Sequence, residues 1–246
     1  MKKNRMMRAA SALLVAVLMT TCTISGTFAK YTTSASGTDT ARVAKWGVEM
    51  TATSADTFAK TYATDDLDVK GTIANSVVSD VDVVAPGTKN DNAAIFTISG
   101  TPEVATEVDV KFEDTFKDVY LKAGTYTDYT KKDANGNYST FTLTQDYYPI
   151  MWTLEMDDNG TVSKFENKSL STIKAYIEAN AANWKYAPNE NLAATFKLSW
   201  AWTFEQGKDE ADTLLGNLAA GTATLDNSLY STGISYDMSI TVTQID

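Results

Sequence analysis

The feature that most constrains the fold is a strict alternation of side-chain character near the end of the chain. Every second position from Phe196 through Trp200 to Phe204 holds a large apolar residue, with small or polar residues between them. Successive side chains of a β-strand point to opposite faces of a sheet, so a period of two is typical of a strand. Full burial of one such side chain contributes roughly 1.5–3 kcal/mol. The pattern predicts a central strand with one face in a core.

The same period recurs along the chain between turn signals. It predicts further strands at Val43–Met50, Val81–Val84, Ala94–Ser99, Glu103–Phe112, Val119–Tyr129, Tyr138–Leu143, Tyr148–Met156 and Ile234–Val242. Pro-Gly at 86–87 and Asn-Gly at 135–136 and 159–160 favour tight turns. The last strand is long and apolar on one face, so we expect it deep in its sheet.

Helical periodicity is confined to two short stretches. Apolar residues three and four positions apart predict one amphipathic helix over Ser171–Trp184, with Ser169 or Ser171 as its cap. A short helical turn is expected at Asp209–Asn217. Because strands and helices do not alternate, we expect a mainly β fold. The predicted class is a single antiparallel β-sandwich of the jelly-roll or immunoglobulin-like kind over residues 43–246.

The first 29 residues have the parts of an export signal peptide. Four basic residues precede an apolar core at Ala9–Met19, and Thr27 and Ala29 form a small-x-small cleavage site. Cleavage there makes Lys30 the new N-terminus and residues 30–42 an extended N-terminal segment. The apolar core is far shorter than the roughly 20 residues that a membrane-spanning helix needs. We therefore expect a secreted protein without a membrane span in its mature form.

Composition excludes several function classes. The signal peptide carries four basic and no acidic residues, so its removal changes the net charge from −10 to −14. Such an acidic surface repels nucleic acid and anionic lipid. The single cysteine, Cys22, lies inside the signal peptide, and the chain has no histidine. Ser-His catalysis, cysteine nucleophiles and histidine-ligated zinc are thereby excluded. We expect no enzyme and no cofactor.

One stretch has the spacing of a calcium-binding loop. Between Glu155 and Glu166, oxygen-bearing side chains stand at the first, third, fifth and twelfth positions, the third and fifth being Asp157 and Asn159, with glycine at the sixth. The strand pattern before this stretch excludes an entering helix, and Asp-Asn-Gly is also a common hairpin tip. We interpret it as a hairpin without a metal, with calcium binding as the alternative.

Two further features have a functional and a structural interpretation. Trp200 and Trp202 could stack on a sugar, but both lie on the apolar side of the strongest strand, which favours a place in the core. Asp209, Glu210 and Asp212 could form an acidic site. Carboxylates also favour the positive end of a helix dipole, so we interpret this cluster as a helix start.

The end of the signal peptide resembles a known family. Gly26-Thr27-Phe28-Ala29-Lys30-Tyr31-Thr32 is similar to the signal-peptide end of the TasA/camelysin family, whose members are processed by a SipW-type signal peptidase. The Pro-Gly turn at 85–88 with the two strands after it, and the terminal strand at 235–243, also resemble that family. Residues 114–230 show no such similarity. Some camelysin-like members are labelled metalloproteases, and the absence of histidine argues against that activity here.

The resemblance implies a structural role. It implies a jelly-roll subunit of biofilm-matrix fibres that polymerises head to tail by donor-strand complementation, with an accessory assembly protein as a further partner. Lys30–Asp39 would be the donor segment, with Tyr31, Thr33 and Ala35 pointing into the next subunit. A monomeric cell-surface or adhesion module that shares only the export signal is the alternative.

Overall fold

The computed structural model describes residues 42–53, 57–63, 75–113, 115–180, 184–204 and 207–245. Contacts divide the chain into one unit over Met1–Trp46 and a second over Gly47–Asp246. The predicted signal peptide, cleavage site and donor segment lie outside the described residues. The strands and helices named below all belong to the second unit.

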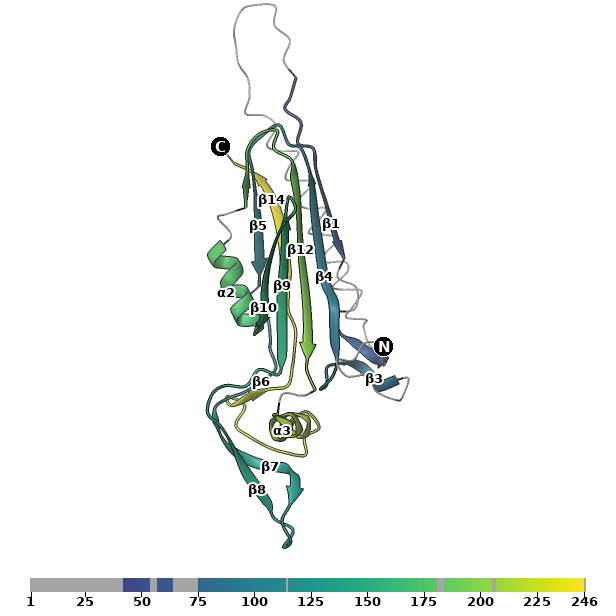
Figure 1. The fold of residues 1–246 in the computed structure, drawn as a ribbon, viewed down its shortest axis with the longest axis vertical. Helices are drawn as coiled ribbons and strands as arrows, with labels where there is room; N and C mark the ends of the chain where they lie inside the picture. Colours follow the sequence, from purple (N-terminus) through teal and green to yellow (C-terminus); the bar gives the residue numbers. More distant parts are fainter. Residues whose placement is uncertain are drawn as a thin grey trace, which may run out of the picture. The chain divides into compact units, whose positions relative to one another are not determined.

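The larger sheet has five antiparallel strands in the order β1-β4-β12-β9-β10 (Figure 1). Their bounds are β1 Val48–Thr53, β4 Lys89–Gly100, β12 Leu192–Trp202, β9 Ile150–Asp158 and β10 Thr161–Lys168. The strand predicted to be central, β12, is the middle strand. It ends at Trp202, however, and Phe204 lies beyond it with 56% of its surface exposed. The alternation of large residues continues past the end of the strand.

The smaller sheet has three antiparallel strands in the order β11-β5-β14. They are β11 Lys185–Tyr186, β5 Thr106–Phe112 and β14 Met238–Gln244. The prediction that the last strand lies deep in its sheet is wrong, because among the described strands β14 pairs only with β5 and is an edge strand of its sheet. Its inward side chains are buried nonetheless, as predicted. An alternating pattern reports which face is covered and not how many neighbours pair with the strand.

Three two-stranded ribbons complete the described strands. β2 (Ala59–Ala63) pairs with β3 (Asn75–Val83), β6 (Tyr120–Leu121) with β13 (Tyr230–Ser231), and β7 (Gly124–Lys132) with β8 (Tyr138–Leu143). The predicted Asn-Gly turn joins β7 to β8, with Gly136 at φ 83°. The single strand predicted at Val119–Tyr129 is therefore two strands, β6 and β7.

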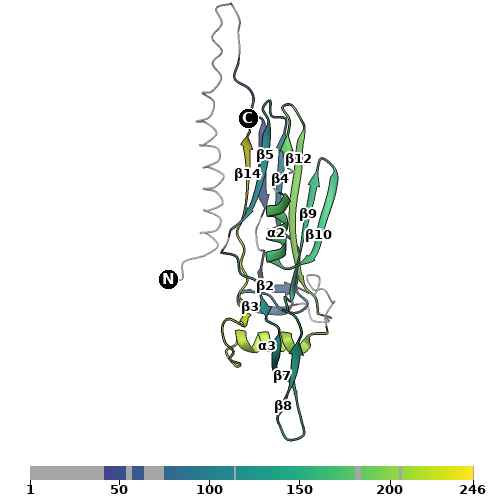
Figure 2. The ribbon, with the colours of Figure 1, turned by 90° about the vertical axis from the view of Figure 1, so that its left-hand side faces the viewer.

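Two helices occur among the described residues. Helix α2 spans Leu170–Asn180, and Ser169 caps it by accepting a 3.4 Å hydrogen bond from the Thr172 N–H, as predicted. The predicted end at Trp184 is too late, because Trp184 is buried outside the helix. Helix α3 spans Asp209–Ala219 and is a full helix where a short turn was expected. α3 packs against β7 (Figure 2).

The core lies where the apolar faces of the two sheets meet. Trp152 of β9 packs edge-on against Tyr236 at 5.5 Å between ring centroids, and Phe58 packs against both Trp152 and Trp200. Trp152 and Trp200 are almost completely buried. Phe58, just before β2, thus packs on the buried face of the five-stranded sheet.

The first strand begins five residues later than predicted. The alternation suggested Val43–Met50, whereas β1 spans Val48–Thr53. Gly47 has φ 57°, a left-handed conformation that interrupts an extended strand before Val48. The described part of the chain is therefore mainly β, with antiparallel sheets and two short helices, as the sequence predicts.

Candidate functional site

In the described part of the chain, helix α2 covers one side of the two sheets, and the opposite side is bounded by an edge strand of each sheet. Helix α2 packs against β5, β9 and β10, and the ring of its Tyr176 stacks on Phe165 of β10 at 4.2 Å. The larger sheet ends in β1 on the side away from α2, and β14 is an edge strand of the smaller sheet (Figure 1). Among the described residues, no strand pairs with the outer edge of either. We call these two strands, Val48–Thr53 and Met238–Gln244, the β1–β14 margin.

The inner-face side chains of β1 are less buried than those of its neighbour β4. Ala52 and Met50 of β1 stand in register with Phe96 and Ile98 of β4 and share their face of the sheet. Phe96 and Ile98 are buried, whereas Met50 is half-buried and Ala52 is exposed. The inner face of β1 is therefore only partly covered.

A hydrogen-bonded cluster fixes the start of β14 against the larger sheet. The Tyr236 hydroxyl lies 2.8 Å from the Thr57 hydroxyl and donates to the Ala93 carbonyl at 3.2 Å. The Thr57 hydroxyl donates to the same carbonyl at 2.8 Å. Burial raises the pKa of Tyr236, so the phenol stays neutral at physiological pH. These hydrogen bonds thus anchor the start of β14 to the core.

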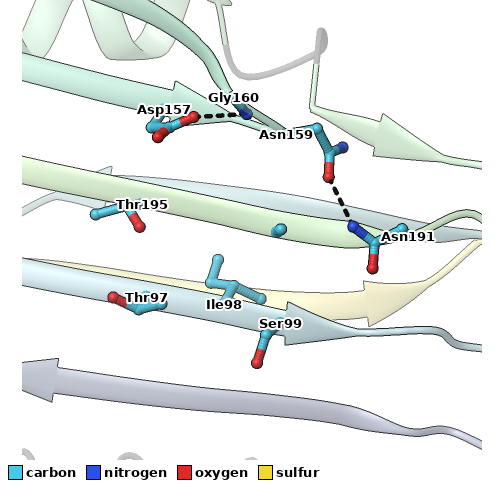
Figure 3. Close-up of a pocket in the computed structure, with 9 residues that line it drawn as sticks. Thr97, Ile98, Ser99, Asp157, Asn159, Gly160, Asn191 and Thr195 are labelled. Carbon is cyan, nitrogen blue, oxygen red and sulfur yellow. Dashed lines mark hydrogen bonds between the residues drawn. The ribbon is translucent and has the colours of Figure 1, made fainter.

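A shallow polar depression of about 320 Å³ lies on the outer face of the larger sheet (Figure 3). Its side chains are mostly hydroxyls and amides from the ends of β4, β9 and β12: Thr97, Ser99, Asp157, Asn159, Asn191 and Thr195. The Asn191 amide donates to Asn159 Oδ1 at 3.2 Å, and Asp157 Oδ1 accepts the Gly160 N–H at 2.8 Å. These groups could hydrogen-bond a small polar molecule.

The calcium-loop spacing falls on the β9–β10 hairpin. Asn159 and Gly160 form its two-residue turn, with φ of 50° and 85°. Glu155 forms an ion pair with Lys164 across the hairpin at 2.7 Å, which lowers the pKa of Glu155. Glu166 lies on β10. No group of three or more acidic, cysteine or histidine side chains in the described part of the chain lies close enough to hold a metal ion.

A buried carboxylate, Asp118, holds the start of α2. Its Oδ2 accepts the Leu170 N–H at 3.0 Å, while its Oδ1 has no hydrogen-bond partner and only 7% of the residue is exposed. Burial raises its pKa from 3.8 to about 6, and the hydrogen bonds from the Leu170 and Val119 N–H groups oppose this shift. The ionisation of Asp118 therefore bears on stability near pH 6.

The acidic cluster at Asp209, Glu210 and Asp212 forms the first turn of α3, as its structural interpretation predicts. Asp212 also accepts a 2.7 Å hydrogen bond from the Tyr147 hydroxyl. Burial raises the pKa of Asp212, and burial beside Asp212 raises that of Tyr147. The cluster joins α3 to the loop before β9.

Sequence reasoning missed three of these features for a common reason. The β1–β14 margin, Asp118 and the polar depression each depend on which distant segments meet, and none has a local pattern. Trp200 and Trp202, by contrast, lie in the core as their alternation predicts, with 2% and 5% of their surfaces exposed.

Comparison with family models, curated proteins and solved structures found no match for this chain. In the described ranges, no helix has the length and apolarity that crossing a membrane requires.

Proposed function

We propose that this protein is a secreted structural subunit of extracellular fibres, with a jelly-roll or immunoglobulin-like sandwich that is completed by a neighbouring copy. The N-terminal segment Lys30–Asp39 of one subunit adds as a strand to the next. Such contacts join two different surfaces and do not close into a ring, so a filament grows. The role requires neither catalysis nor a cofactor.

The observation that carries this proposal is the β1–β14 margin. β1 is an edge strand of the larger sheet and β14 an edge strand of the smaller one, and neither has a described strand beside its outer edge. Unpaired N–H and C=O groups along an edge strand form a template for another chain, and natural proteins usually protect such edges. A half-buried Met50 and an exposed Ala52 on the inner face add apolar surface that an incoming strand would cover.

Export and signal-peptide cleavage determine when polymerisation can begin. The signal peptide directs the chain out of the cell, and a SipW-type peptidase releases Lys30 as a free N-terminus. Before cleavage the donor segment remains attached to the signal peptide and is not free to enter a second subunit. Polymerisation is thereby restricted to the extracellular matrix or cell surface, alone or with an accessory assembly protein.

Deletion of the donor segment tests this function. The mature protein, residues 30–246, is expected to form filaments that sediment on ultracentrifugation, and the variant beginning at residue 40 is expected to remain a folded monomer. Filaments of unchanged yield from the shortened chain would contradict the donor assignment.

A matched pair of variants separates a pairing role from a general effect of charge. Aspartate at Tyr31 and Thr33 places two charges on the side of the donor that faces the next subunit, and we expect it to abolish filaments. Aspartate at Thr32 and Ser34 adds the same charge on the opposite side and is expected to be tolerated.

A second candidate function, a monomeric surface or adhesion module, rests on the polar depression. Its hydroxyl and amide lining suits a neutral, hydroxyl-rich ligand such as a polysaccharide. This role predicts binding of a neutral polysaccharide by the shortened monomer, and loss of binding when Thr195→Trp fills the depression. No binding by isothermal calorimetry at millimolar sugar concentration would remove this candidate.

A further inference from the structure

The hydrogen-bond register shows which backbone groups of β14 point away from its sheet. Asp237 O accepts the Glu113 N–H at 3.0 Å before the strand, and the Ile245 N–H donates to Ala105 O at 3.0 Å after it. The pairing between these points is antiparallel and without a bulge. Hydrogen-bonded pairs alternate along an antiparallel ladder. The outer edge therefore presents the N–H and C=O groups of Met238, Ile240, Val242 and Gln244.

The edge strands differ in how well they are protected against pairing. β10 carries Lys164 and Lys168, has a register shift between Phe165 and Lys168, and lies beside α2. β1 is regular but carries Glu49. β14 has no charged side chain and no irregularity over its seven residues. Charges and bulges are the usual protection of a sheet edge, so β14 is the least protected of these three strands.

A strand added to β14 would also have an apolar surface beneath it. β14 lies on the side of β5 that is away from α2 and toward β1 (Figure 1). The next strand position in that sheet therefore lies further toward β1, where Met50 is half-buried and Ala52 is exposed. A strand added to β1 would instead extend the larger sheet beyond the smaller one, with no described element facing it.

We infer that the outer edge of β14 is the acceptor for residues 31–38 of a second copy of this chain, an inference that rests on the proposed function. Residues 31–38 are eight consecutive uncharged residues, which matches an uncharged edge of seven. Tyr31, Thr33 and Ala35 then face the larger sheet, and Thr32 and Ser34 face solvent beside Ser239, Thr241 and Thr243 of β14.

Disulfide mapping tests the edge, because the mature chain contains no cysteine of its own. Ser34→Cys is combined in turn with Ser239→Cys, Thr241→Cys and Thr243→Cys on β14, and with Glu49→Cys, Thr51→Cys and Thr53→Cys on β1. All are on outward faces, and disulfides form only when the Cβ atoms lie about 3.5–4.5 Å apart. Mild oxidation of assembled protein is expected to give covalent ladders on a denaturing gel from at least one β14 combination and from none on β1.

Thr33→Cys is the matched control, because the inference puts residue 33 on the opposite side of the donor from Thr241. It is expected to give no ladder with any of the three β14 cysteines. Ladders from β1 alone, or none from β14 in filaments that require residues 30–39, would overturn the edge assignment and leave the proposed function standing. If the mature protein forms no filaments, the proposed function and the edge assignment both fail.

Discussion

Replacing Asp118 by asparagine should remove a specific part of the pH dependence of stability. Burial raises the pKa of this carboxyl to about 6 in the folded chain, against 3.8 ordinarily. The folded state therefore favours the protonated form. The stabilising effect of protonation is fully present below about pH 4 and is lost as the pH rises through 6. The amide of the asparagine would keep an acceptor for the Leu170 N–H without the charge.

The size of the effect follows from the pKa difference. A shift of about 2 pKa units corresponds to about 3 kcal/mol between the fully protonated and fully ionised states, of which about 2–3 kcal/mol falls between pH 4 and pH 7.5. The difference in unfolding free energy, variant minus wild type, should be larger at pH 7.5 than at pH 4 by this amount. Any constant cost of the buried amide cancels in this comparison.

Urea unfolding followed by tryptophan fluorescence at pH 4, 6 and 7.5 measures the difference directly, since the chain has five tryptophans. The other carboxylates are common to both proteins and cancel. A difference in unfolding free energy that stays constant within about 0.5 kcal/mol over this range, against the expected change of about 2–3 kcal/mol, would refute the buried, ionisable role of Asp118.

Two further pairs of variants test the fold. Gly100→Ala puts a Cβ 2.0 Å from the Gly47 carbonyl oxygen at φ +148°, so it should lower the free energy of unfolding by at least ~2 kcal/mol. Gly216→Ala in α3 meets no atom within 4 Å and should raise the free energy of unfolding by about 0.5–1 kcal/mol. Equal melting temperatures for the two variants would count against the register of β1 and β4. Leu154→Ala on the buried face of β9 should lower the free energy of unfolding by about 2–5 kcal/mol, and Thr153→Ala on the outer face should lower it by less than about 1 kcal/mol. If urea unfolding shows the larger loss for Thr153→Ala, the faces of β9 are exchanged.

The sequence predicts the strands and their buried faces well because both are local properties. The alternation in β12 and β14 identifies the inward side chains in each, and the Asn-Gly pairs mark two hairpins. Lateral position is different, because it depends on which distant strand pairs with an edge. For this reason the same alternation that correctly places β12 at the centre of its sheet leads to the wrong position for β14.

The candidate site was much less predictable. The N–H and C=O groups on an open edge belong to the backbone and have no sequence signature, and Asp118 reaches the start of α2 from 52 residues away. The apparent calcium loop is the reverse case, in which a sequence pattern is present but the ligand cluster it suggests is not formed by the described residues. Its spacing arises from a hairpin whose Asn-Gly turn and paired strands place Glu155 beside Lys164.

Electron microscopy of the purified mature protein, residues 30–246, tests the central claim most directly. The proposal predicts unbranched filaments of one repeating subunit for this chain and single particles for the chain that begins at residue 40. Single particles from both chains, or filaments from both, would contradict strand donation by residues 30–39.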